Sequence, residues 1–191
     1  MGDTTTNPFT PTEIWNDTRV TVREGDEEKQ VDAKHYHVRY MVGESEDKRF
    51  VDSGENDVAS LSDKTLYLVP SIHRIMDEPF HYDVSAVHQI SGKDNIEGKV
   101  RHLKRNGQCD DHEMIEVTFQ SPGVECCAMS KDEADKQRVP LKYLAGYLLG
   151  KSDGFLKVAL SKTELDSGGA YYESIHIIPE AVVKEWSCLE A

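Results

Sequence analysis

The sequence predicts a mainly β protein made of two small β-barrels in tandem, with short helical turns between some of the strands. Short segments alternate apolar and polar residues with the period of a β-strand, and glycine, proline or charged turns separate them. Two similar blocks also recur along the 191 residues, a length that accommodates two small domains. We therefore expect a flexible tail over residues 1–13, a first barrel of the five-stranded type over 14–80, and a second barrel over 81–191 that carries an added hairpin.

The individual strands and turns are predicted from local patterns. The clearest alternation lies at 18–24, 33–43, 65–70, 114–120 and 171–179. In the second of these segments, one face of the strand carries Tyr36, Val38, Tyr40 and Val42. Residues 71–78 place apolar side chains at helical spacing, which predicts a short helix capped by Ser71. Ser130 and Glu133 have the spacing of a capping box, which predicts one or two further helical turns.

The stretch AGYLLGKS at residues 145–152 matches a loose phosphate-loop pattern, but its surroundings argue against nucleotide binding. A phosphate loop needs a glycine-rich backbone and a following helix whose N-terminus faces the anion. Here three bulky apolar residues occupy the spacer, and Gly154 interrupts any helix after Ser152. We therefore predict a β-hairpin whose turn lies at residues 150–154.

Two pairs of similar segments predict an internal repeat. The first pair is 39–47 and 146–154, in which Tyr147 follows Tyr40 by 107 residues (147 minus 40). The second pair is 66–78 and 174–186, in which Pro179 follows Pro70 by 109 residues (179 minus 70). The alternative is chance, because hairpins share glycine turns and strands share apolar residues.

The order of features over residues 143–186 carries a resemblance to a known architecture. The pattern GYLLG…FLKVALS…IHIIPEAVV resembles the small five-stranded barrels of the SH3-like and Sm-like type, in which a proline or 3₁₀ turn separates the last two strands. The chain departs from the Sm pattern, because it has no Asp-x-x-Asn-like RNA-pocket signature and no basic nucleotide-facing loop. The resemblance therefore implies an architecture without implying a ligand. In style, the same block also resembles small accessory proteins of bacteria and their phages.

Charge and cysteine content bear on partners and location. The chain has 35 acidic and 22 basic residues and a formal charge of -13, which repels nucleic acid at long range and favours a basic protein partner. No apolar run reaches the ~18 residues that a membrane span needs, and no signal peptide opens the chain. The four cysteines form no Cys-x-x-Cys pair, so we expect free thiols in a cytoplasmic protein, with adjacent Cys126 and Cys127 as packing residues of a strand.

The sequence predicts no catalytic residue, no cofactor and no metal ligand. His35 and His37 share a strand face, and the turn at 109–113 gathers Cys, Asp, His and Glu, but no partner motif completes a zinc site. Neither a Gly-x-Ser-x-Gly elbow nor a signature around a reactive cysteine is present. The sequence therefore favours a non-enzymatic function over an enzymatic one.

Two groups of residues are candidate binding surfaces. A basic arm supplies candidate phosphate contacts, unless it pairs with acidic neighbours: Lys99, Arg101, Lys104 and Arg105. Aromatic side chains at the expected barrel edges form a candidate surface for a protein partner, unless they are ordinary half-buried packing residues: Tyr40, Tyr147, Tyr171, Tyr172 and Trp186.

These observations lead to one leading function and two alternatives. The leading hypothesis is a non-enzymatic protein-interaction or assembly module, without a membrane association, that contacts another protein or a second copy of itself. The first alternative is nucleic-acid binding through the arm at 99–105, which the net charge disfavours. The weaker alternative is a hydrolase whose site the sequence does not reveal.

Overall fold

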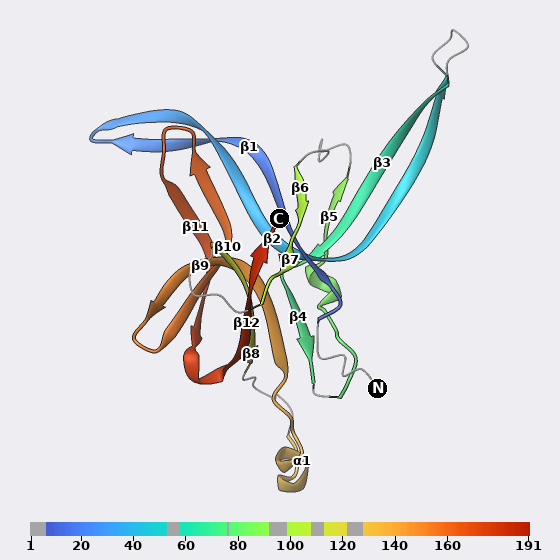
Figure 1. The fold of residues 1–191 in the computed structure, drawn as a ribbon, viewed down its shortest axis with the longest axis vertical. Coiled ribbons are helices and arrows are strands. Elements are labelled where there is room, and N and C mark those ends of the chain that lie inside the picture. The colour runs from blue at the N-terminus through green and yellow to red at the C-terminus, as the bar shows by residue number, and fades with distance from the viewer. Residues whose placement is uncertain (1–6, 53–57, 76, 92–98, 108–112, 122–127) are drawn as a thin grey trace.

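The computed structural model describes residues 7–52, 58–75, 77–91, 99–107, 113–121 and 128–191. Within them the chain is mainly β, as the sequence predicts, and twelve antiparallel strands form one sheet (Figure 1). The strands are β1 (Thr10–Glu24), β2 (Glu27–Asp52), β3 (Val58–Val69), β4 (Ser71–Arg74), β5 (His88–Ser91), β6 (Val100–His102), β7 (Lys104–Arg105), β8 (Met114–Gln120), β9 (Leu141–Ser152), β10 (Phe155–Leu165), β11 (Ala170–Pro179) and β12 (Val183–Glu190). The short helices are the 3₁₀-helices η1 (Val84–Ala86) and η3 (Glu180–Val182) and the α-helix α1 (Lys131–Asp135).

The strands fall into two groups that have the same order of pairing. In one group the order across the sheet is β6-β1-β2-β3-β5, and in the other it is β12-β8-β9-β10-β11. We refer to these groups as the first unit and the second unit. By this pairing the first unit extends to β6, beyond residue 80, where we expected the first barrel to end.

The registers of the two units correspond residue by residue. Ile14 lies opposite His37 between β1 and β2, and Val117 lies opposite Leu144 between β8 and β9. On the other side of β2 the pairing with β3 skips one residue before Gly43, and on the other side of β9 the pairing with β10 skips one residue before Gly150. The skipped residues are Val42 and Leu149. Both units therefore bulge at the same point.

The third strand of each unit also pairs with the other unit. The first part of β10 lies on β9, whereas Ser161–Leu165 lie on Ala33–His37 of β2. In the same way β3 lies on β2, and after Pro70 the chain continues as β4, which lies on Leu141–Leu144 of β9. Because the units share strands, two separate barrels are not confirmed, and the sheet is not closed.

With strands paired between the units in this way, the buried apolar side chains form three clusters. A central cluster takes residues from both units, including Val38, Tyr40, Ile72, Tyr143 and Tyr147. The second unit has its own cluster, which includes Val117, Phe119, Leu144, Leu160 and Ile178. The first unit has a smaller one, made of Ile14, Leu66 and Leu68 with partly buried Met41, Ile90 and Val100. The expected apolar face of 33–43 is confirmed, because its four residues all belong to or pack on the central cluster.

The hairpin prediction at AGYLLGKS is confirmed, but the turn is shorter than the predicted 150–154, because residues 150–152 still pair with β10. Residues 145–152 lie within β9, the turn follows at Asp153 and Gly154, and β10 returns antiparallel to β9. Both turn residues have positive φ angles of 54° and 79°, a conformation that glycine adopts without steric cost. No helix begins at Lys151, so this segment has no N-terminus to face a phosphate.

Two other local predictions differ in outcome. Ser130 and Glu133 form the expected capping box at the start of α1. The helix expected at 71–78 is wrong, because Ser71–Arg74 form β4 instead. Ile72 lies fully buried opposite Tyr143 of β9, so pairing with the second unit outweighs the helical spacing of a few apolar residues.

The tail and the second repeat block also need correction. Residues 10–13 are not tail, because β1 begins at Thr10 and both Thr12 and Glu13 are buried. The segments 66–78 and 174–186 are not equivalent, because β3 pairs directly with β2 whereas β11 pairs with the outer side of β10. By register, the counterpart of β11 is β5, since Leu66 faces Ile90 as Leu156 faces Ile178.

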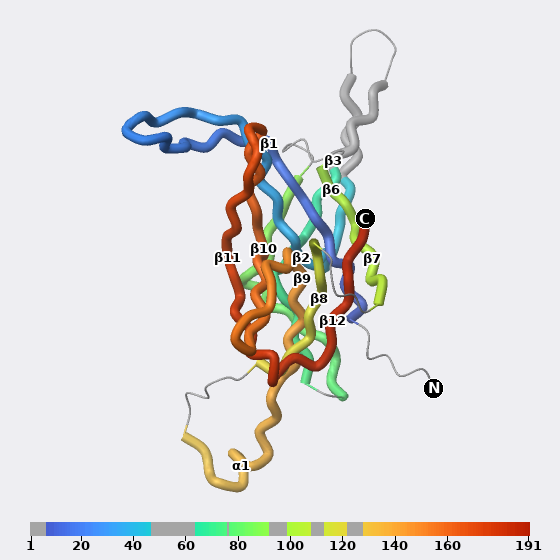
Figure 2. Tube along the Cα trace, turned by 60° about the vertical axis from the view of Figure 1, so that its left-hand side comes forward, coloured from blue at the N-terminus to red at the C-terminus, as the bar shows by residue number. Residues whose placement is uncertain are grey.

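The long hairpins extend away from this shared body. The hairpin of β1 and β2 projects to one side, and the hairpin of β9 and β10 turns back near η3 (Figures 1 and 2). Helix α1 lies at the opposite end from the tip of the β1–β2 hairpin and at the same end as the turn of β9 and β10 (Figure 2).

Candidate functional site

Tyr40 and Tyr147 lie in the central core and form no binding surface. Their side chains are 0% and 1% exposed. The Tyr40 hydroxyl donates a hydrogen bond of 2.6 Å to Glu116 in the second unit, and the Tyr147 hydroxyl donates one of 2.6 Å to Glu13 in the first. Burial and the adjacent carboxylate raise the pKa of both phenols, which therefore stay protonated and act as donors. These reciprocal bonds join the two units.

The basic arm supplies the cations that complete these networks. Arg105 donates to both carboxylate oxygens of Glu116, at 2.6 Å and 2.9 Å, and Arg101 forms an ion pair with Glu13. Lys99 lies 3.4 Å from an exposed Asp17 carboxylate. Three of the four candidate phosphate contacts are thus paired with carboxylates of the same chain. This agrees with the alternative hypothesis that the arm pairs with acidic neighbours. Lys104 is exposed.

The sequence does not predict that Glu13 and Glu116 are buried. Glu116 lies between Ile115 and Val117 in an alternating strand, so period-two logic assigns it to solvent. In the fold both faces of β8 are covered, because one faces the second unit's core and the other faces the central cluster. The only available signal was the recurrence of a glutamate beside an apolar residue in β1, at Glu13, at the equivalent register position.

The remaining aromatic candidates differ in position. Trp186 is half-buried against the second unit's core, and the Lys151 ammonium lies 3.7 Å from its ring centroid. Tyr171 and Tyr172 are exposed on β11, where Ile175 and Ile177 are also exposed. Among the described strands, β11 pairs only with β10, so its outer edge faces solvent. Of the candidate surface, the exposed part is therefore on β11. It includes Ile175 and Ile177, which were not among the predicted residues.

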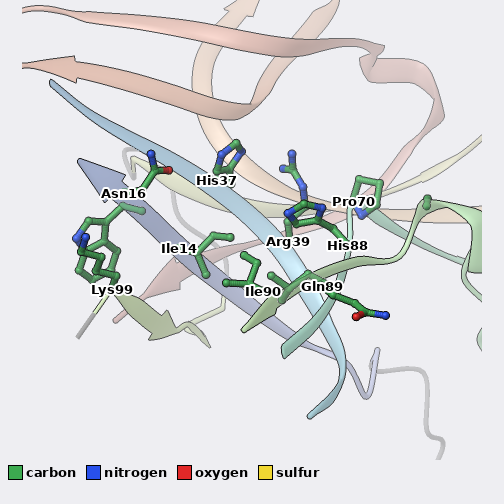
Figure 3. Close-up of a pocket in the computed structure, with 12 residues that line it drawn as sticks. Ile14, Asn16, His37, Arg39, Pro70, His88, Gln89, Ile90 and Lys99 are labelled. Atoms are coloured by element: carbon green, nitrogen blue, oxygen red, sulfur yellow. The ribbon is translucent and has the colours of Figure 1, made fainter. Parts of the chain in front are cut away.

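A cavity of about 840 Å³ opens on the first unit. Figure 3 shows its lining: β1 contributes Ile14 and Asn16, β2 contributes His37 and Arg39, and β5 contributes a third side. Pro70 and Lys99 complete the rim. This volume lies within the range of roughly 300–1,000 Å³ that is typical of small-molecule sites.

His35 and His37 point the same way, as predicted, and their rings lie 4.2 Å apart. Each Nδ1 atom is within hydrogen-bond distance of a hydroxyl on β10, at 2.7 Å to Thr163 and 3.0 Å to Ser161. Burial, with neighbouring positive groups, lowers the pKa of His37 to about 4, so this ring is neutral at pH 7. Within the described residues, no cluster of three or more His, Cys, Asp or Glu side chains is arranged to hold a metal ion.

Cys188 corrects the expectation of free thiols, because it is disulfide-bonded. It is buried in β12 opposite Ile115 of β8. Disulfides persist mainly in oxidising compartments, so the cysteines no longer support a cytoplasmic location. The expected packing role of Cys126 and Cys127 and most of the 109–113 turn fall outside the described residues.

The disulfide limits the number of free thiols in the unreduced protein. In the denatured, unreduced protein we expect a thiol reagent to label at most two of the four cysteines, because one bond consumes two thiols. Mass spectrometry before and after reduction measures this directly. Labelling of all four cysteines without reduction would contradict the bond.

Comparison with known proteins gives no relative: no family model, curated protein or solved structure matches the chain. Among the described helices, none has the length and apolar character needed to cross a bilayer.

Proposed function

We propose that this protein is a non-enzymatic assembly module that associates with a second copy of itself through β11. The observation that carries the proposal is the exposed apolar strip on this edge strand. Tyr171, Ile175 and Ile177 are 56%, 47% and 61% exposed. An unprotected apolar edge of this kind is a favoured place for another chain to bind.

The charge of the strip allows a second copy as the occupant, although Glu173 shares the exposed face of Tyr171 and Ile175. The whole chain carries a formal charge of -13, and two such chains repel each other. Within β11 the only acidic residue is Glu173, so repulsion is locally weak where apolar contact is available. A symmetric contact would place the same apolar strip on both sides of the interface.

The proposal includes an internal duplication as the origin of the two units. The shared strand order, the matching registers and the bulges at Val42 and Leu149 support it. Within one chain, β4 and β10 each pair with a strand of the other unit. The proposed contact of β11 would join two chains in a similar way.

Light scattering coupled to size exclusion tests the association. We expect the wild-type chain to dimerise between roughly 10 and 200 µM, and the double variant Ile175→Glu/Ile177→Glu to remain monomeric, because two charges replace the apolar contact. Rising salt should strengthen the dimer by screening the repulsion between acidic chains.

Val84→Glu is the matched control, because Val84 is 77% exposed but lies in η1, away from β11. It should leave the dimer unchanged. A wild-type chain that stays monomeric throughout this range would overturn self-assembly. A dimer that survives the double variant would place the contact elsewhere.

A further inference from the structure

The cavity of the first unit differs from the matching region of the second unit in three residues. By register, Asn16, His37 and Pro70 correspond to Phe119, Leu144 and Leu160. The second-unit residues are all buried in an apolar cluster. The first unit has a polar or smaller side chain at each of these positions. Its cavity of about 840 Å³ is accordingly larger than the pocket of about 220 Å³ at the matching place in the second unit, which Phe119 and Ile178 help to line.

The lining combines an apolar wall with positive charge. Ile14 and Ile90 supply apolar surface from β1 and β5. Arg39 and Lys99 supply two cations, and no acidic side chain belongs to the described lining. This excess of positive charge is local, since the chain as a whole is strongly acidic.

Arg39 is placed to bind an anion. Both hydrogen bonds that it makes within the described residues come from Nη1, at 2.8 Å to the Val38 carbonyl and 3.2 Å to the Leu160 carbonyl. These bonds fix the guanidinium, which has further N–H donors. Burial lowers the pKa of Arg39, but the ordinary value for arginine is so high that the group stays charged at pH 7. Lys99 is mostly buried, and its partner Asp17 is 68% exposed, so solvent weakens that pair.

We propose that this cavity binds a small amphipathic anion, with its acidic group at Arg39 and its apolar part against Ile14 and Ile90. Lys99 lies at the opposite end of the cavity and adds positive charge at the rim. The imidazole of His37 is already hydrogen-bonded to Ser161 and shapes one wall. The site is independent of β11 and of self-association, so either proposal can fail alone.

Two dyes of similar shape test the charge requirement. The probe is 8-anilinonaphthalene-1-sulfonate, and N-phenyl-1-naphthylamine is its uncharged counterpart. We expect the wild-type chain to bind the sulfonate at one site. Arg39→Gln should weaken it about tenfold, the loss expected for one charged hydrogen bond, whereas Lys99→Gln removes only a more distant charge and should weaken it less. The affinity for the uncharged dye should change less than about twofold.

A filling variant tests the location. Asn16→Phe/His37→Leu/Pro70→Leu introduces the side chains of the second unit and should abolish sulfonate binding, whereas Val139→Glu, at an exposed position outside the lining, should not affect it. Thermal unfolding checks that each variant is folded. If the filling variant fails to fold, the two single substitutions still decide the question. Equal losses for both dyes, or no loss in either single variant, would overturn the proposal.

Discussion

Gly146→Ala is expected to lower the free energy of unfolding by about 3 kcal/mol, near the upper end of the usual cost of overpacking a core. A Cβ atom at this position would lie 2.4 Å from the Ala159 carbonyl oxygen and 2.9 Å from Cγ1 of Val158. The oxygen belongs to the backbone of β10, which pairs with both β9 and β2, so it cannot move without disturbing both units. Chemical denaturation measures the loss.

Gly43→Ala is the control for this change. Gly43 is also a strand glycine, at the bulge of the first unit, but the nearest atom to an added Cβ is Cδ2 of Tyr67 at 3.6 Å. That distance is an ordinary van der Waals contact, so the free energy of unfolding should change by less than about 1 kcal/mol. Equal destabilisation by the two alanines would show that backbone freedom, and not the clash, is responsible.

Glu116→Leu is expected to have a similar or larger effect, about 3–5 kcal/mol, because it breaks a buried ion pair on one side only. The substitution leaves Arg105 without its two charge-assisted bonds and removes the acceptor of the Tyr40 hydroxyl. It also severs one of the two reciprocal bonds between the units. The lower end of the range is favoured, because the Arg105 side chain is partly exposed.

Replacing Arg105 and Tyr40, the groups that Glu116→Leu leaves without a partner, should restore stability. The triple variant Glu116→Leu/Arg105→Met/Tyr40→Phe replaces the network by apolar groups and should recover at least half of the loss. Glu24→Leu, at the exposed end of β1, controls for the loss of a negative charge and should change the free energy of unfolding by less than about 0.5 kcal/mol. If the triple variant is no more stable than Glu116→Leu, the network is not what the single substitution disrupts.

The sequence by itself determined the local elements whose signals are strong within a few residues. The alternation at 114–120 gave β8 with its bounds, and the turn residues Asp153 and Gly154 gave the hairpin of β9 and β10. The capping box at Ser130 gave α1. These features depend on side-chain period, φ freedom and short-range hydrogen bonds, all of which are fixed by neighbouring residues.

Only the tertiary structure decided how the two units combine. The exchange of β4 and β10 buried Tyr40, Tyr147 and Glu116, which local patterns assigned to surfaces. It also made β4 a strand in place of the expected helix. Whether a strand face meets solvent or a second layer depends on partners about a hundred residues away, and a period of two cannot distinguish those cases. The cavity also depends on the tertiary structure, because its walls come from β1, β2 and β5, which are separate in sequence.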